Sequence, residues 1–250
     1  MMTVVAEKRI TDCIFPEKGV VSFVGGGGKT SLLFRFAEEL HARGNRVIVS
    51  TSTHMFRPDH VPVLDVFDVE ALHVLLDEGQ IVCVGKPAAN GKITLPDTDF
   101  ALIRGCCDYL LIEADGAKRM PLKIPASHEP AIPECTGHVI AVMGLDACGR
   151  KAEESLFRYE LAEEILSIGP KDRIVPAHFK ILAESPRALR KNVLPGMKYS
   201  VILNKADTDE LTRLGTDIMQ SLDGKVVDSC AVSSVWKGWF YRESTSERRR

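Results

Sequence analysis

The stretch VSFVGGGGKTSLLFRF at residues 21–36 constrains the fold most, because four consecutive glycines join an apolar run to an amphipathic pattern. A phosphate-binding loop needs a strand that stops abruptly, backbone N–H groups that converge on an anion, and a helix N-terminus behind them. Glycine permits this path because it has no Cβ atom. The stretch therefore predicts a strand, a phosphate-binding loop and a helix in succession.

The spacing of this loop departs from the usual motif. The pattern GxxxxGK[ST] would begin at position 23, where the chain has Phe23. The alternative interpretation is a flexible glycine turn between a buried strand and a helix. A lysine and a threonine at the first helical turn favour the phosphate site, where the lysine would reach the β and γ phosphates and the hydroxyl would ligate Mg²⁺. The residues expected to bind a nucleoside triphosphate are Gly25, Gly26, Gly27, Gly28, Lys29, Thr30 and Ser31.

Apolar, β-branched runs alternate with helical patterns along the rest of the chain. Strands are predicted at residues 20–24, 46–51, 80–85, 109–115, 138–144, 198–204 and 225–232, and helices after the glycines and at 67–78, 153–168 and 208–222. This alternation is typical of βα units around a parallel sheet. We predict an α/β fold with a mostly parallel sheet of about seven strands and helices on both faces, similar to P-loop NTPases. Residues 1–240 would form a single nucleotide-binding domain, and residues 241–250 a flexible C-terminal tail.

Composition argues against several classes of protein. The chain has 32 Lys and Arg against 34 Asp and Glu, which gives a formal net charge of −2 and no basic field for a nucleic acid or an anionic membrane. Its seven cysteines are odd in number and include no CxxC pair. This pattern favours reduced thiols over the disulfide framework of a secreted protein. No signal peptide or membrane span is apparent. We expect a cytoplasmic protein with no nucleic-acid partner and no membrane partner.

A second motif is NKAD, which follows an apolar run at residues 199–203. A carboxylate at Asp207 would accept both the N1–H and the N2 amine of guanine, a donor pair that adenine lacks. The stem of Lys205 would pack on the base, and Asn204 would tie this loop to the phosphate loop. The alternative is an ordinary strand-to-helix turn, with the aspartate near a helix N-terminus. The expected cofactors are therefore GTP, with ATP still open, and Mg²⁺.

The run YLLIEADG places carboxylates at the carboxyl edge of the sheet, where open α/β folds bind ligands. Glu113 is in the position for a Mg²⁺ contact together with Thr30, and Asp115 is the rival ligand. The spacing from Glu113 to Gly116 resembles the turn that senses the γ-phosphate in GTPases related to signal-recognition and nickel-delivery proteins. Gly116 is therefore a further candidate for nucleotide contact.

Three basic residues follow at once: Lys118, Arg119 and Lys123. In a loop that switches they would neutralise phosphate charge. A solvated basic loop is the alternative, and for Lys123 it fits at least as well. The candidate catalytic residues are Lys29, Glu113, Asp115 and Arg119.

Cysteines and histidines give weaker signals. The side chains of Cys106 and Cys107 would diverge, which argues against a shared metal. One of them is a candidate thiol for handling sulfur or selenium, but a buried, inert cysteine is the commoner case. His54 and His128 are candidates to line the site, although a structural or surface role is the simpler interpretation.

A wider set of segments extends these motifs: VGGGGKTSLL, STSTHM (50–55), IEADGAKRMPLKIPASHEPAIP (112–133), GLDACG (144–149) and LNKAD (203–207). Together they resemble the accessory proteins proposed for selenium-dependent molybdenum hydroxylases, the YqeC family, over roughly residues 18–235. The resemblance implies a cytosolic P-loop protein that works beside other factors in maturing a molybdenum hydroxylase with labile selenium. Residues 50–53, SerThrSerThr, stand where nickel-delivery GTPases carry an aspartate, so Mg²⁺ would have fewer carboxylate ligands or would use hydroxyls.

Two functions remain open at this stage. In the first, the protein is a slow, Mg²⁺-dependent GTPase whose loop switches a contact with the hydroxylase or with one of its maturation factors. In the second, it is a P-loop kinase or nucleotide-dependent transferase for a small molecule such as the molybdenum cofactor or a selenium species, which predicts a cavity facing the γ-phosphate. A nickel metallochaperone is disfavoured because a His-rich tract and a CxC pair are absent. The oligomeric state is open, with a homodimer among the options.

Overall fold

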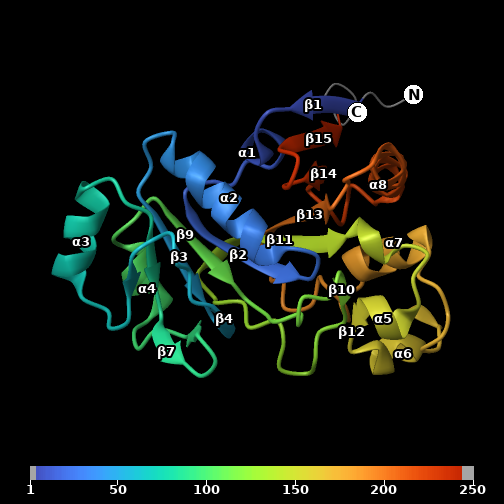
Figure 1. Cartoon of the computed structure of the whole chain (residues 1–250), viewed down its shortest axis with the longest axis horizontal. Helices are drawn as coiled ribbons and strands as arrows, with labels where there is room; N and C mark the ends of the chain where they lie inside the picture. Colours follow the sequence, from blue (N-terminus) through green and yellow to red (C-terminus); the bar gives the residue numbers. More distant parts are fainter. Residues whose placement is uncertain (1–3, 244–250) are drawn as a thin grey trace.

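A ten-stranded sheet forms the centre of the computed structural model, which describes residues 4–243 (Figure 1). Its strand order is β1 (Val4–Glu7), β15 (Trp239–Glu243), β14 (Ser229–Ser234), β13 (Lys198–Asn204), β11 (Thr136–Gly144), β2 (Gly19–Gly25), β9 (Tyr109–Glu113), β3 (Val47–Thr51), β6 (Val82–Val84) and β5 (Val63–Leu64). The strands from β14 to β5 run parallel, and β15 and β1 add an antiparallel edge. The α/β class and the mostly parallel sheet are thus confirmed.

The predicted number of strands, about seven, is too low. All seven predicted strands are present, and they are the strands from β14 to β6, whose apolar runs are buried on both faces as parallel sheets require. The three that sequence reasoning missed, β1, β5 and β15, lie at the edges of the sheet, where short or more polar strands are common. β15 extends to Glu243, into the segment predicted as a tail. The rest of that predicted tail, residues 244–250, lies outside the described residues.

Three of the four predicted helices are present as α2 (Lys29–His41), α3 (Val69–Asp77) and α8 (Asp209–Ser221). The single helix predicted at residues 153–168 is wrong. That segment instead contains α5 (Ala152–Ser155), β12 (Leu156–Phe157), the 3₁₀ turn η2 (Tyr159–Leu161) and α6 (Ala162–Leu166). The helix breaks because Leu156 and Phe157 pair with strand β10 (Leu122–Lys123), and Arg158 follows with a left-handed φ of 64°.

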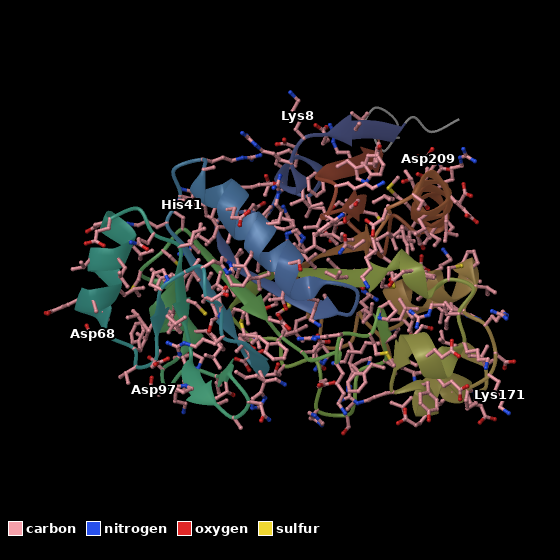
Figure 2. The ribbon with its side chains drawn as sticks, in the orientation of Figure 1. Lys8, His41, Asp68, Asp97, Lys171 and Asp209 are labelled. Carbon is pink, nitrogen blue, oxygen red and sulfur yellow. The ribbon has the colours of Figure 1, made fainter. Side chains whose placement is uncertain are left out.

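Helices cover both faces of the sheet, as predicted. α2 and α1 (Ile10–Cys13) pack on one face, where the Phe23 and Phe36 rings meet with centroids 5.4 Å apart. The other face is covered by α3 and α4 (Phe100–Arg104) over one half, and by α6, α7 (Pro176–Glu184) and α8 over the other half. In Figure 2 His41 marks the end of α2. Among the helices of residues 4–243, none is both long and apolar enough to cross a membrane.

A small antiparallel sheet lies beyond the carboxyl end of β3. It has the order β4 (His54–Phe56), β8 (Lys92–Thr94), β7 (Lys86–Ala88). Its inner side buries Met55 and Ile93. Sequence reasoning missed this sheet, because strands of three residues are too short to show an alternating pattern. Its position beside β3 makes it one wall of the cavity described below.

Glu39 anchors the N-terminal segment to α2. Its buried carboxylate accepts hydrogen bonds from the backbone N–H of Ile10 (3.3 Å) and from the N–H (2.9 Å) and hydroxyl (2.8 Å) of Thr11. Arg35, one turn away, donates to the same carboxylate at 2.6 Å. Without this acceptor, two buried amides of α1 would lose their partner.

We expect Glu39→Ala to lower the free energy of unfolding by about 3 kcal/mol, because buried donors left without an acceptor keep their full desolvation cost. Glu38→Ala is the matched control, since the neighbouring Glu38 is exposed and its loss should change stability by less than about 0.5 kcal/mol. Urea unfolding followed by circular dichroism measures both. Equal stability of the two variants would contradict the anchoring role.

Candidate functional site

The path of the glycine loop is fixed by close backbone contacts. Gly27 and Gly28 have φ values of 71° and 105°, a region that other residues rarely adopt. A Cβ atom on Gly27 would lie 2.2 Å from the backbone nitrogen of Gly144, and one on Gly26 would lie 2.7 Å from the carbonyl oxygen of Met120. Neither neighbour can move without shifting the backbone, so glycine is required at these positions.

The amides of the loop fall into two groups. Three of them donate to acceptors of the protein: Gly25 to the Asp115 carboxylate (3.0 and 3.2 Å), Gly26 to the carbonyl of Val142 (2.9 Å) and Gly27 to that of Met120 (3.0 Å). The next amides, from Gly28 to Ser31, donate to no acceptor within the described residues. They form the first turn of α2, where a helix has no partners of its own for its N–H groups. An anion would therefore bind at this helix start rather than along all four glycines.

Lys29 is buried at this helix start, with 5% of its surface exposed. Its Nζ donates to the carbonyl of Gly25 at 2.5 Å and lies 3.0 Å from Oδ1 of Asp115. Burial acts most strongly on the pKa of Lys29 and lowers it, but the carboxylates of Asp115 and Glu113 outweigh burial, and the net pKa is raised. The side chain is therefore an ammonium at neutral pH and supplies positive charge next to the free amides.

Thr30 and Glu113 bring two side-chain oxygens together on the cavity wall. The Thr30 hydroxyl donates to Oε2 of Glu113 at 2.6 Å. Burial raises the pKa of Glu113, although Lys29 and the Thr30 hydroxyl oppose it. Hydroxyl and carboxylate oxygens are ligands that Mg²⁺ takes, and the rest of its octahedral shell is commonly water and phosphate. No group of three His, Cys, Asp or Glu side chains gathers for a metal in residues 4–243, so a cation here would need such outside ligands.

Asp115 has a different position from Glu113. Its carboxylate accepts from the amide of Gly25 and lies 3.0 Å from Lys29 Nζ and 3.1 Å from Lys123 Nζ. It is 1% exposed, whereas Glu113 lines the cavity. The geometry therefore favours Glu113 over Asp115 as a metal ligand and gives Asp115 the task of holding the loop.

Lys123 is the centre of a buried ion network and is not part of a solvated loop. Its Nζ lies 2.7 Å from Oε2 of Glu129, 3.1 Å from Asp115, and donates to the carbonyl of Gly116 at 2.6 Å. Arg158 also donates to Glu129, at 2.5 Å. Burial would raise the pKa of Glu129, but the hydrogen bonds from Lys123 and Arg158 outweigh burial and lower it. Sequence reasoning missed Glu129 and Arg158; the charged residue within the HEPAIP segment was the available signal for Glu129.

Asn204 connects the NKAD segment to the glycine loop. Its Nδ2 donates to the carbonyl of Gly27 at 2.8 Å, and its Oδ1 accepts from the Ser233 hydroxyl at 3.0 Å. The first contact is the tie that the sequence suggested. Because a Cβ atom on Gly28 would lie 2.8 Å from the same Nδ2, this glycine is also required by Asn204.

The rest of the NKAD segment is held by polar partners. Lys205, with a left-handed φ of 65°, pairs with Oδ2 of Asp146 at 2.8 Å, and Asp207 accepts from the Ser234 hydroxyl at 2.5 Å. The other oxygen of Asp146 is buried with no hydrogen-bond partner within the described residues. Asp146 was missed as a site residue, although it lies in the GLDACG segment.

A cavity of about 550 Å³ brings most of these residues together at the carboxyl edge of the sheet. Lys205 lines one end, and the start of the small sheet lines the other. Between them lie the glycine loop, the helix start with Ser31, Glu113 and the basic loop with Gly116 and Arg119. Asn204, Asp115 and Asp207 are not among its lining residues. Asn204 and Asp115 bind the glycine loop from behind the cavity wall, and Asp207 lies beside the wall.

The remaining candidates divide between the two ends of the strands. His54 lines the cavity, whereas His128 is exposed elsewhere. Cys106 and Cys107 precede β9 and so lie at the amino end of that strand, opposite the glycine loop. Burial raises the pKa of Cys107 to about 12, which keeps it a thiol. The structure therefore gives neither cysteine a place at the cavity.

Comparisons with known proteins identify the family. The family model described as YqeC protein matches residues 21–160. The protein named "Uncharacterized protein YqeC" from Escherichia coli strain K12 is 37% identical over 226 residues, which cover 88% of this chain and 86% of that protein. The chain belongs to the YqeC family. The resemblance inferred from the sequence is thus confirmed. The part of this YqeC-family chain that the family model matches contains the glycine loop, Glu113 and Lys123, and it ends before Asn204. No solved structure matches the chain.

We expect Lys123→Ala to lower the free energy of unfolding by about 3–5 kcal/mol, because removing one member of a buried ion network leaves its partners uncompensated. Lys118→Ala is the matched control: Lys118 lies on the same loop and near the same Phe157 ring, but it is exposed. Thermal and urea unfolding compare the two variants. A control as unstable as Lys123→Ala would show that the loop itself, and not the buried charge, matters.

Proposed function

We propose that this YqeC-family protein binds a nucleoside triphosphate with Mg²⁺, preferring GTP over ATP, and hydrolyses it slowly as an accessory protein in the cytosol. Its task would be the maturation of a selenium-dependent molybdenum hydroxylase, through contact with the hydroxylase or its maturation factors. The observation that carries the proposal is the helix start of α2, whose free amides lie beside Lys29 and the Thr30–Glu113 pair on one cavity wall.

The phosphate chain is the ligand that this wall fits best. The amides from Gly28 to Ser31 and the dipole of α2 favour an anion, and α2 is long enough, at 13 residues, to have a full dipole. The buried ammonium of Lys29, next to the glycine loop, adds positive charge. It now contacts the carbonyl of Gly25, so it would exchange this contact for a phosphate oxygen on binding.

Thr30 and Glu113 would hold Mg²⁺, which when bound neutralises charge on the β and γ phosphates. The pair fits because its two oxygens are already 2.6 Å apart and line the cavity. Arg119 is a candidate to neutralise further phosphate charge. Its guanidinium now lies 5.1 Å above the Phe56 ring, so this role would require it to leave the ring.

The NKAD segment supports the preference for guanine. Ser234 occupies only Oδ1 of Asp207, and a carboxylate has about four acceptor positions, so both guanine donors can still be accepted. The pair between Lys205 and Asp146 fixes the ammonium and leaves the lysine stem to pack on a base. Asn204 then connects the base end of the site to the phosphate end.

A second candidate function, a kinase or nucleotide-dependent transferase for a small molecule, is favoured by one observation. The cavity continues past Glu113 to residues 53–56 and Lys92, which gives room beyond the expected terminal phosphate. A switch GTPase needs no such room. Turnover that depends on an added acceptor would favour the transferase, and turnover stimulated by a protein partner would favour the switch.

The decisive test is a calorimetric titration with GTP, ATP and CTP, each with and without Mg²⁺. We expect GTP to bind at least about a hundredfold more tightly than ATP, because adenine offers the Asp207 carboxylate neither of the two donors that guanine supplies. Asp207→Asn should lose about tenfold or more of this preference and bind xanthosine triphosphate better. Asp209→Asn, which changes an exposed carboxylate at the start of α8, is the matched control. Equal binding of GTP and ATP would remove the guanine assignment, and no binding of any triphosphate would refute the proposed function.

We expect substitutions of Glu113 and Asp115 to have different effects. Glu113→Gln should lower the Mg²⁺-dependent gain in nucleotide affinity by about tenfold, because an amide is a weaker ligand than a carboxylate. Asp115→Asn should instead lower the melting temperature, because it weakens the buried pairs with Lys29 and Lys123. Titrations at several Mg²⁺ concentrations and a thermal melt measure both effects. The reverse pattern would make Asp115 the metal ligand.

A further inference from the structure

One end of the cavity has an aromatic and basic surface, of which the proposed nucleotide site uses Arg119 alone. Phe56 at the end of β4 is 51% exposed and lines the cavity. Two cations lie over its ring: Arg119 Cζ at 5.1 Å and Lys92 Nζ at 5.2 Å from the centroid. We call these three residues the Phe56 surface, together with Lys118, which lines the same cavity and whose Nζ lies 5.3 Å from the centroid of the Phe157 ring. Its residues come from the small sheet and from the basic loop after β9.

The order of strands places this surface away from the base. β13, which ends at Asn204, lies on one side of β2, and β9 and β3 lie on the other side. A nucleotide whose base is at Lys205 and whose phosphates follow the helix start of α2 would end near Glu113, the last residue of β9. Phe56 and Lys92 belong to the small sheet that follows β3, and so they lie one strand further on, beyond the terminal phosphate.

The Phe56 surface has three cations that form no ion pair within the described residues. Lys29 and Lys205 are each paired with an aspartate, and Glu129 is paired with two cations. By contrast, no carboxylate pairs with Lys92, Lys118 or Arg119 within the described residues. Three uncompensated cations on a cavity wall favour an anionic ligand.

The exposed ring adds a second requirement. An aromatic face in a cavity is a platform on which a flat ring stacks. A ligand ring would take the place of a cation that now lies over Phe56, and that cation would then pair with the negative charge of the ligand. Lys118 and Arg119 both have left-handed φ values, 46° and 63°, which cost energy in residues other than glycine. The surrounding structure therefore holds this loop with its basic residues at the cavity.

We propose that the Phe56 surface is a second-ligand site that binds a small anion with a flat ring, beside the terminal phosphate of the bound nucleotide. This inference rests on the proposed function, because that function defines where the phosphate ends. The second ligand is defined by both its charge and its shape. An uncharged ring would not pair with the cations, and an anion without a ring would not stack on Phe56.

The test uses two fluorescent flat-ring anions, pterin-6-carboxylate and 2-naphthoate, added to the full chain saturated with a non-hydrolysable GTP analogue and Mg²⁺. We expect both to bind, and inorganic phosphate and uncharged 6-methylpterin to bind at least about tenfold more weakly. Phe56→Ala should weaken the binding of both anions by about tenfold or more, and Lys92→Gln by about fivefold.

Controls come from the same chain. Phe15→Ala removes another exposed phenylalanine and Lys86→Gln another lysine of the small sheet, and neither lines the cavity, so both should leave the binding of the anions unchanged. Loss of binding in these controls would overturn the inference, and so would a failure of both anions to bind. Tighter binding of the anions when the nucleotide analogue is left out would also overturn it, because the two ligands would then compete for one site. The same samples report the affinity for the nucleotide analogue. Failure of the nucleotide to bind would refute the proposed function, whereas a bound nucleotide without anion binding would refute the second-ligand site alone.

Discussion

The Asp115 carboxylate is the interaction on which the candidate site depends. It accepts from the amide of Gly25 and lies between the buried ammonium groups of Lys29 and Lys123. One side chain thus sets the start of the glycine loop, the position of its lysine and the base of the basic loop. A carboxylate can be buried here because its charge is matched on both sides and its oxygens are hydrogen-bonded. Removing any partner would leave charge in the interior.

The ion network extends this constraint to distant parts of the chain. Lys123 also pairs with Glu129, and Glu129 pairs in turn with Arg158. Arg158 directly follows β12, the strand that pairs with β10. The departure from a helix at residues 153–168 is therefore part of the site, since a continuous helix would not give the β12 pairing that brings Arg158 next to Glu129. Fold and site are determined together in this region.

The central strands and the glycine loop could be predicted from the sequence, because apolar runs buried on both faces and a strand–glycine–helix order are local signals. The burial of Lys123 could not be predicted from the sequence, because it depends on ion pairs with Asp115 and Glu129 that form only in the tertiary structure. The same holds for the partners of Lys205 and Asp207, which come from another loop and another strand. The small sheet was missed for a different reason: its strands carry too few residues for a pattern.

The hydrogen bond from Asn204 to the carbonyl of Gly27 joins two loops that are 177 residues apart in sequence. Because the glycine loop has little freedom of its own, a shift at the end of β13 would be transmitted directly to the backbone that precedes the helix start. The two ends of the cavity are in this sense one mechanical unit. A ligand long enough to reach both ends would meet two parts that are already held together, so its second contact would be made with little further loss of freedom.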